Sequence, residues 1–383
     1  MSAVAVPVEW IDTHAALTAA AAQWHREPAL GLDTEFVRER TFFPQLGIVQ
    51  VGGHSQAWLI DAVAIGDLTP LLTVLEDARV TKVVHSCSED MEVLFHRFGE
   101  FPRPLFDTQV AAALAGLGPS LSYQRLVHEL LGVEIPKGET RSDWLRRPLS
   151  PAQVEYAARD VELLLPLHDR LRPQLADEGR ADWVLEETAR MRDPSRFLPP
   201  PEEVYRRLGG TGGMSPRQLA VARALAEWRE IEARERDLPR NFVLRESALI
   251  QLARRQPATA AELAEVPEVG RGLVKRYARP LLEVIAGALD LPRDRLPVPA
   301  RRIPSSENVQ AAMRRLQEWV AQRAGELGVP APVLASRRDL RDLALWILER
   351  EAGAPPAVLQ GWRRQQIGES LLPMAREALR GLR

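Results

Sequence analysis

The sequence predicts an α/β domain built around a mixed sheet, followed by two all-α helical domains. Strand-like apolar segments occur only before residue 108, where they alternate with helical patterns. After residue 214 the apolar residues repeat with helical periodicity and form no convincing strand. Two stretches rich in proline and glycine separate these regions. We therefore expect domains at 1–195, 214–291 and 306–380, joined by linkers at 196–213 and 292–305.

The first domain is expected to open with a helix and a sheet of closely spaced strands. Thr13 is placed to cap a helix over 14–25. Three apolar segments follow at short spacing, and they predict a three-stranded antiparallel meander over 28–36, 46–51 and 57–60.

Helices and strands are then expected to alternate. Short strands should end at His85 and Asp107, and Ser88 is placed to cap the helix that Gly99 ends. The helices of this part are predicted over 68–77, 89–98, 108–115 and 121–132, with a helical stretch from 150 to about 191.

The two helical domains share a sequence pattern. Leu225 and Trp228 recur as Leu316 and Trp319, and a proline follows each tryptophan after eleven residues, at 239 and 330. Copies of a helical module keep their core spacing while other positions drift, so the pattern predicts an internal repeat. The alternative is that these positions are ordinary core positions of a helical bundle.

Composition limits the class of protein. The chain has 383 residues, of which 45% are hydrophobic, and it has one cysteine, which excludes an intramolecular disulfide. No apolar run approaches the ~20 residues that cross a bilayer, and the N-terminus lacks the basic start of a signal peptide. We expect a cytoplasmic protein without a membrane segment.

Charge is distributed unevenly. Residues 1–200 carry 19 basic and 29 acidic side chains, whereas residues 201–383 carry 31 and 23, so the two parts have net charges of −10 and +8. An acidic front part that binds cations and a basic back part that binds a polyanion would produce this division. Heavy use of arginine can equally reflect genome composition.

The predicted strand at 28–36 carries two carboxylates. Asp33 and Glu35 are two residues apart, so in a strand both point to the same side. Like charges at this spacing repel and raise each other's pKa unless a cation neutralises them. Oxygen ligands suit magnesium and manganese. The alternative, ordinary surface acids on a strand edge, is the commoner origin of an Asp-x-Glu pair taken alone.

Three further polar residues are placed near sheet ends or on an inward helix face. Asp90 lies in the first turn of the helix after the strand that ends at His85. Tyr156 and Asp160 are four residues apart, hence on one face of a helix, within an apolar stretch. Four gathered acids would form an oxygen site for two divalent cations, the arrangement that hydrolyses phosphodiesters. Tyr156 would then orient the attacking water.

These residues carry a resemblance. Asp33-x-Glu35, Asp90 and Tyr156-x-x-x-Asp160 resemble the three motifs of the DEDDy 3′→5′ exonucleases. The stretches at 107–109, 137–144, 147–149 and 153–160 are similar to the bacterial ribonuclease D family in particular, and residues 228–244 resemble its HRDC helical domain.

The resemblance implies a ribonuclease H-like fold for the first domain and two HRDC-like domains after it. It further implies an exoribonuclease that uses two Mg²⁺ or Mn²⁺ ions to release 5′-mononucleotides from RNA 3′ ends, with tRNA precursors and stable RNA as substrates and no obligate protein partner. Carried over residue by residue, Asp33, Glu35, Asp90 and Asp160 would hold the metals, Tyr156 would position the water, and Glu35 would also meet the terminal ribose.

Four other residues are candidates for substrate binding, each with a plain structural alternative. His85 and Lys137 would line the substrate path, or they would be a packed strand end and a solvated loop. Lys275 and Arg276, at a helix start after Gly270, would bind RNA phosphates or belong to a solvated basic helix. Asp107 is interpreted as a structural or capping residue.

Two other functions stay open at this point. A 3′→5′ DNA exonuclease would share the site, because only contacts to the 2′-hydroxyl distinguish RNA from DNA locally. A catalytically inactive nucleic-acid-binding scaffold would have no need for clustered carboxylates, which repel phosphate when no metal is bound.

Overall fold

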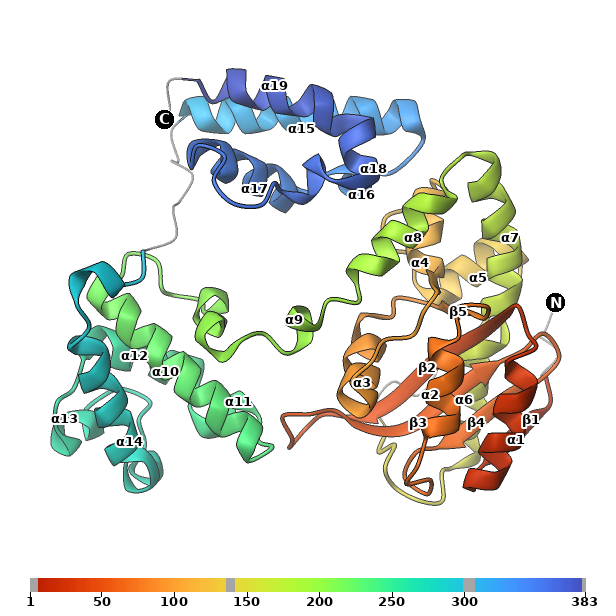
Figure 1. Ribbon diagram of the computed structural model, residues 1–383, viewed down its shortest axis with the longest axis horizontal. Helices are drawn as coiled ribbons and strands as arrows, with labels where there is room; N and C mark the ends of the chain where they lie inside the picture. The colour runs from red at the N-terminus through yellow and green to blue at the C-terminus, as the bar shows by residue number, and fades with distance from the viewer. Residues whose placement is uncertain (1–5, 136–141, 299–306, 381–383) are drawn as a thin grey trace. The chain divides into compact units, whose positions relative to one another are not determined.

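The computed structural model describes residues 6–135, 142–298 and 307–380 (Figure 1). The chain divides into two compact units. The first comprises 1–37, 46–192 and 302–383, and the second comprises 38–45 and 193–301. No helix of the described residues is long and apolar enough to cross a membrane.

The first unit contains a six-stranded mixed sheet in the order β1-β4-β3-β2-β5-β6. Strand β3 runs antiparallel to β4, whereas β1 is parallel to β4 and the β2, β5 and β6 strands are parallel to one another. The strands are β1 (Val8–Ile11), β2 (Ala29–Val37), β3 (Gln45–Gly52), β4 (Ala57–Asp61), β5 (Thr81–Val84) and β6 (Leu105–Asp107). The mixed sheet is confirmed.

The edge strand β1 was not predicted. It has four residues, of which only Ile11 is buried, so it carries no strong apolar pattern of its own. Its register against β4, from Val8 opposite Ala57 to Ile11 opposite Ile60, makes it a strand.

Several helices surround this sheet. The cap at Thr13 is confirmed, because its side chain accepts from the N–H of Ala16, and Gly99 ends α3 in the left-handed conformation at φ 76°. The helices are α1 (His14–Trp24), α2 (Thr69–Glu76), α3 (Ser88–Phe98), α4 (Thr108–Leu114), α5 (Tyr123–Leu131), α6 (Pro151–Glu162), α7 (Leu164–Asp177) and α8 (Ala181–Arg190).

The cap predicted for the helix after His85 was wrong. Ser88 is the first residue of α3 rather than its cap, and Cys87 occupies the cap position without a side-chain hydrogen bond. The turn before α3 is held instead by the Asp107 carboxylate, which accepts from the N–H groups of Ser86 and Cys87. The helical stretch predicted from 150 to about 191 is present and consists of three helices, with breaks at Leu163 and between α7 and α8.

The second unit is helical. Its long helix α10 begins with a capping box at Ser215 and packs against α12 and α14. The elements are α9 (Pro194–Phe197), η1 (Pro201–Arg207), α10 (Pro216–Glu235), α11 (Arg240–Val243), α12 (Glu246–Arg255), α13 (Ala260–Ala264), α14 (Arg271–Leu289) and η2 (Arg293–Arg295). Within the stretch expected to be a linker, η1 packs on α10 and buries Val204. The limits proposed for the domains remain predictions.

The second helical module repeats the pattern of the first. In both, a long helix is followed by a one-turn helix that begins directly after Pro239 or Pro330. The elements are α15 (Glu307–Leu327), α16 (Ala331–Leu334), α17 (Arg337–Leu348), η3 (Ala357–Leu359), α18 (Gly361–Arg363), η4 (Arg364–Gly368) and α19 (Glu369–Ala378). This module packs on α8, where Trp183 stacks on Trp362 with ring centroids 4.4 Å apart.

Candidate active site

Strand β2 presents two carboxylates, as its sequence predicts. Asp33 and Glu35 are half-buried, whereas Leu30 and Leu32, earlier in the strand, are buried. The alternation of side chains in a strand places both acids on the same side. Strand β2 lies inside the sheet, between β3 and β5, so its backbone is held on both edges.

Helix α6 can approach the sheet closely because glycines face it. A Cβ atom added at Gly52 would lie 2.6 Å from the carbonyl oxygen of Val161, and one added at Gly31 would lie 3.1 Å from the same oxygen. Val161 directly follows Asp160, so the absence of these two side chains sets how near the Asp160 carboxylate comes to β2. One carboxylate oxygen each of Asp33, Glu35 and Asp160 lie within 4.8 Å of one another.

The junction between α6 and α7 is fixed just beside Asp160. The Tyr123 hydroxyl donates to the carbonyl oxygen of Arg159 at 3.1 Å and accepts from the N–H of Leu163 at 3.1 Å. Tyr123 itself is buried. These bonds hold the backbone on both sides of Asp160, so the carboxylate is presented by rigid structure.

Asp90 is the fourth acid, and it lies just outside the group of three. It is 9% exposed in the first turn of α3, and its Oδ1 accepts a hydrogen bond from the Thr34 hydroxyl. Its charge nevertheless raises the pKa of Asp33, Glu35 and Asp160. Thr34 therefore ties α3 to β2, a role that the sequence did not suggest, since Thr34 is an ordinary strand residue between two acids.

Burial raises the pKa of all four acids, and the charges of neighbouring acids in the group add to this for Asp33, Glu35 and Asp160. Burial, followed by the charges of Asp160 and Asp90, raises the pKa of Glu35 to about 8. Burial raises the pKa of Asp160 to about 7 and that of Asp90 to about 6, and it raises the pKa of Asp33 as well. No arginine, lysine or histidine of the described residues forms a salt bridge with any of the four.

Tyr156 lies one helical turn before Asp160, on the same face of α6. Burial, with the charges of Asp160 and Glu35, raises the pKa of the phenol, so the hydroxyl keeps its proton. Its ring packs against Trp144 with centroids 6.1 Å apart. A phenol that stays protonated acts as a hydrogen-bond donor and acceptor that orients a neighbour, which favours the orienting role over that of a base.

The loop before α6 is anchored by a buried ion pair. Arg147 donates to both carboxylate oxygens of Asp61, at 2.7 and 2.6 Å, and to the carbonyl oxygen of Gly47 at 2.9 Å. The Arg147 partner, with the backbone amides of Val63 and Ala64, lowers the pKa of Asp61 despite its burial. Sequence reasoning missed Asp61, whose signal was only its place at the end of a strand.

The four acids fit divalent cations. They offer oxygen donors only, which suits Mg²⁺ and Mn²⁺, and their like charges repel without a cation between them. A group of buried carboxylates without a basic partner is costly for the fold, and bound cations would remove that cost.

The other candidate residues differ in what the structure shows. Both ring nitrogens of His85 have protein partners, the Thr108 hydroxyl at 2.9 Å and the carbonyl oxygen of Leu121 at 3.1 Å, which favours the packing role. Lys137 lies outside the described residues. Lys275 and Arg276 are exposed in the first turns of α14, and the Arg276 guanidinium lies 6.0 Å from the Tyr277 ring centroid.

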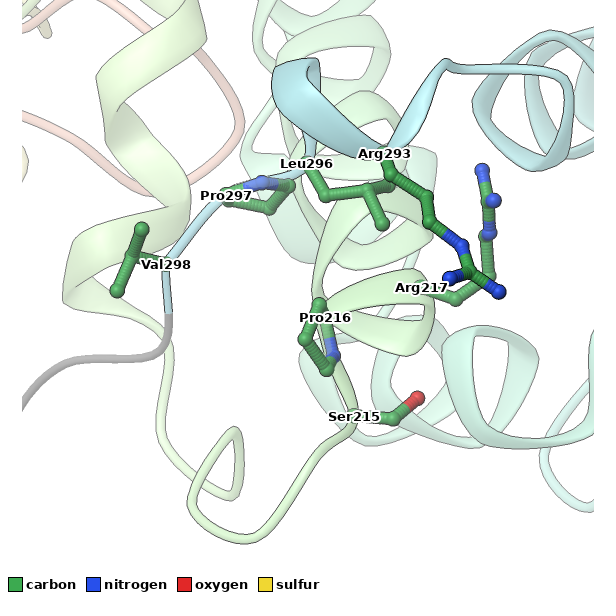
Figure 2. A pocket seen from close by; sticks show the side chains of 7 residues that line it. All are labelled: Ser215, Pro216, Arg217, Arg293, Leu296, Pro297 and Val298. Carbon is green, nitrogen blue, oxygen red and sulfur yellow. The ribbon is translucent and has the colours of Figure 1, made fainter.

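A pocket lies in the second unit, at the start of α10. Its volume is about 580 Å³, and Figure 2 shows Arg217 and Arg293 on one side of it and Val298 on the other. Arg217 already donates to the carbonyl oxygens of Leu289 and Leu291. The hollow contains none of the candidate site residues, so size alone does not identify the reactive centre.

Comparison with known proteins agrees with the geometry. The family described as 3′-5′ exonuclease matches residues 8–176, the HRDC domain matches 218–285, and the ribonuclease D C-terminal HRDC domain matches 308–371. The two HRDC matches support the internal repeat.

Curated ribonuclease D proteins are similar to this chain over nearly its whole length. The chain is 40% identical to ribonuclease D of Pseudomonas paraeruginosa over 97% of this chain and 98% of that protein. It is 36% identical to ribonuclease D of Escherichia coli over 91% and 93%. The crystal structure of Escherichia coli RNase D, described as an exoribonuclease involved in structured RNA processing, matches with a TM-score of 0.91 and 35% identity over 97% of this chain and 99% of that one. The chain therefore belongs to the ribonuclease D family and is a 3′→5′ exoribonuclease.

Proposed function

We propose that this exoribonuclease removes 5′-mononucleotides one at a time from RNA 3′ ends by two-metal-ion hydrolysis, with Asp33, Glu35, Asp90 and Asp160 as the metal ligands. The observation that carries the proposal is the grouping of three carboxylates within 4.8 Å of one another. Their raised pKa values, and the lack of a salt bridge to them in the described part of the chain, add to it.

Divalent cations held by these four acids would supply positive charge and would lower the pKa of a coordinated water. The side chains of the protein orient the water, bind the terminal ribose and hold the acids in place. Tyr156, whose ring packs against Trp144, orients the attacking water. Glu35, at the outer end of the carboxylate pair on β2, accepts a hydrogen bond from the terminal ribose. Thr34 donates to Asp90 and so ties that carboxylate to β2.

The proposed substrates are tRNA precursors and other stable RNAs. The Escherichia coli relative is described as acting in structured RNA processing, and two HRDC domains offer surface for binding a structured RNA. We propose Mg²⁺ or Mn²⁺ as the ion and the cytoplasm as the place of action.

The test is a degradation ladder on a 5′-labelled RNA that has a single-stranded 3′ end next to a duplex. With Mg²⁺ or Mn²⁺ the products should shorten by one nucleotide at a time, and with a chelator they should not. Tyr156→Phe should slow cleavage by about 10²- to 10³-fold, since it removes one orienting hydroxyl from the reaction. Tyr277→Phe, which removes a phenolic hydroxyl from helix α14 of the second unit, is the matched control and should leave the rate unchanged.

Two outcomes would replace the proposal. Degradation of a matched DNA strand with the RNA left intact would indicate a DNA exonuclease. A folded protein that binds RNA and degrades neither strand with either metal would indicate a binding scaffold.

A further inference from the structure

A pocket in the second unit brings part of the loop between β2 and β3 together with the first HRDC domain. Its volume is about 460 Å³. Arg38, Thr41 and Phe42 line it from the loop, and Arg229, Arg240 and Asn241 line it from the helical domain. The lining is therefore rich in hydrogen-bond donors, whereas a ligand site for a neutral apolar molecule would be mostly apolar.

Arg229 is the unusual residue of this pocket. It lines the pocket with only 4% of its surface exposed. Its Nη1 donates to the carbonyl oxygen of Leu244 at 3.3 Å, and its Nε has no partner among the described residues. Burial lowers its pKa. A buried guanidinium without a bound anion is unfavourable. An anion bound beside Arg229 would therefore stabilise its charge.

The carboxylates nearby are already engaged or do not reach Arg229. Glu230 is bound to Arg234 and Arg240. Glu246 also lines the pocket and its charge favours the protonated Arg229, but its Oε1 accepts from the N–H of Gly209 at 2.9 Å. No salt bridge joins Arg229 to any described carboxylate. Counting Glu39, the lining has three arginines against two glutamates.

The pocket is held in shape by its own contacts. Asp237 Oδ1 accepts from the N–H groups of Phe42 and Phe43, at 2.9 and 3.0 Å. Phe42 is 3% exposed, and the Arg240 guanidinium lies 4.6 Å from the centroid of its ring. Because the loop is fixed on the helical domain by these bonds, a ligand would meet donors that are already in place, which lowers the entropy cost of binding.

We propose that this pocket binds a backbone phosphate of the RNA substrate, with Arg229 and Asn241 as donors. A guanidinium presents paired N–H groups that match phosphate oxygens. Arg38 follows Glu35 by three residues in the sequence, so the loop that lines the pocket continues directly from the carboxylate strand. The inference rests on the proposed function, since it assigns a second contact to the same RNA strand.

The experiment measures binding of a fluorescein-labelled single-stranded RNA of 12 nucleotides to the full chain in a chelator, at several salt concentrations. Arg229→Met keeps an unbranched side chain of similar size and removes the buried charge. It should weaken binding by about tenfold and reduce the slope of log K against log salt by about 0.7, the value for one phosphate contact on a single strand. Arg279→Ala, in the same domain and 89% exposed, removes one arginine outside the pocket and should change the slope less.

A second variant covers the case in which Arg229→Met does not fold. Asn241→Asp places a carboxylate at the exposed rim without touching the buried arginine, and it should weaken RNA binding on the order of fivefold. An unchanged affinity and slope in a folded Arg229→Met, or in Asn241→Asp where that variant alone folds, would overturn the inference. Protection from thermal unfolding by inorganic phosphate that depends on Arg229, with RNA binding unaffected, would also overturn it and indicate a free-anion site.

Cleavage kinetics distinguish a failure of this inference from a failure of the proposed function. With Mg²⁺, Arg229→Met should raise KM for the 12-nucleotide RNA with kcat unchanged, because the lost contact is equal in ground and transition states. Wild-type protein that fails to degrade RNA would contradict the proposed function itself. Wild-type protein that degrades RNA with the same KM as the variant would contradict only the phosphate site.

Discussion

Two acidic places in this protein, one buried and one half-buried, are built in opposite ways. Glu230, on α10, is 1% exposed and binds two arginines, Arg234 at 2.6 Å and Arg240 through both carboxylate oxygens. Those partners lower its pKa although burial alone would raise it. Asp33 and Glu35, on β2, have raised pKa values and no basic partner in the described part of the chain.

The difference separates a structural acid from a ligand site. A buried carboxylate that serves the fold is neutralised by the fold itself, as Glu230 is. A buried carboxylate group left without cations makes the folded state less favourable, and such a group persists where an external ion completes it. Four changes test this contrast, in order of decreasing expected effect.

Asp33→Asn should abolish cleavage, by at least about 10³-fold, because a charged ligand next to the reacting phosphate is lost. The unfolding temperature without metal should stay the same or rise, since one of several repelling charges is removed. The ladder assay and a thermal unfolding curve check both parts. Retained activity would contradict the metal-ligand assignment.

Glu230→Gln should have the opposite result, a loss of stability with cleavage kept. It leaves Arg234 and Arg240 without their carboxylate, and we expect a loss of about 2–3 kcal/mol in the free energy of unfolding, reduced by the partial exposure of both arginines. Cleavage per folded molecule should be unchanged. Denaturant unfolding of the full chain measures the first, and the ladder assay at low temperature measures the second. A loss of activity without a loss of stability would break the comparison.

Gly52→Ala should weaken both folding and cleavage moderately. The added Cβ would lie 2.6 Å from the Val161 carbonyl oxygen, so α6 must shift. We expect about 1–3 kcal/mol of destabilisation and a loss of about tenfold or more in kcat from displacement of Tyr156 and Asp160. Gly66→Ala, where nothing lies within 4 Å of the added atom, is the control and should leave both unchanged. Equal behaviour of the two variants would exclude the close-approach explanation.

The pH dependence of stability should be reversed from the usual one. The folded pKa values of Glu35, Asp160 and Asp90, about 8, 7 and 6, lie above those of the unfolded chain, so the folded protein binds more protons. This part of the stability is fully present below about pH 4 and is lost as pH rises from about 6 to 8. We expect metal-free protein to melt a few degrees lower at pH 8 than at pH 6, after allowance for the rest of the chain.

Divalent metal should remove that loss, and more so at the higher pH, because the ligands must lose their protons to bind it. The check is thermal unfolding with Mg²⁺, Mn²⁺ or a chelator at both pH values. In Asp33→Asn the metal effect should shrink. A metal-free protein whose stability rises across this range, with no change in that slope in the variant, would contradict the repulsion argument.

Local chemistry made several features predictable. The spacing of Asp33 and Glu35 requires one side of a strand, the spacing of Tyr156 and Asp160 requires one face of a helix, and Thr13 and Gly99 mark helix ends. These relations depend only on the period of the element and on the conformations that single residues accept. The catalytic roles assigned to the acids and to Tyr156 remain predictions, because the structure shows that these side chains lie together but not what reaction they perform.

Other features depended on contacts between distant segments. Strand β1 exists because β4 offers an edge, and α6 approaches β2 and β3 because Gly31 and Gly52 leave room for Val161. Asp61 and Thr34 gained their roles from Arg147 and Asp90, which are 86 and 56 residues away in the chain.

By itself the sequence determined which residues could carry the chemistry and on which face of each element they would lie, because helix and strand periods are local properties. Only the tertiary structure decided that the acids of β2 and α6 come within 4.8 Å of one another while Glu230 receives two arginines. Whether a buried charge is neutralised or left for an ion depends on which distant side chains pack beside it. A local pattern does not contain that information, because the partners are brought together by packing.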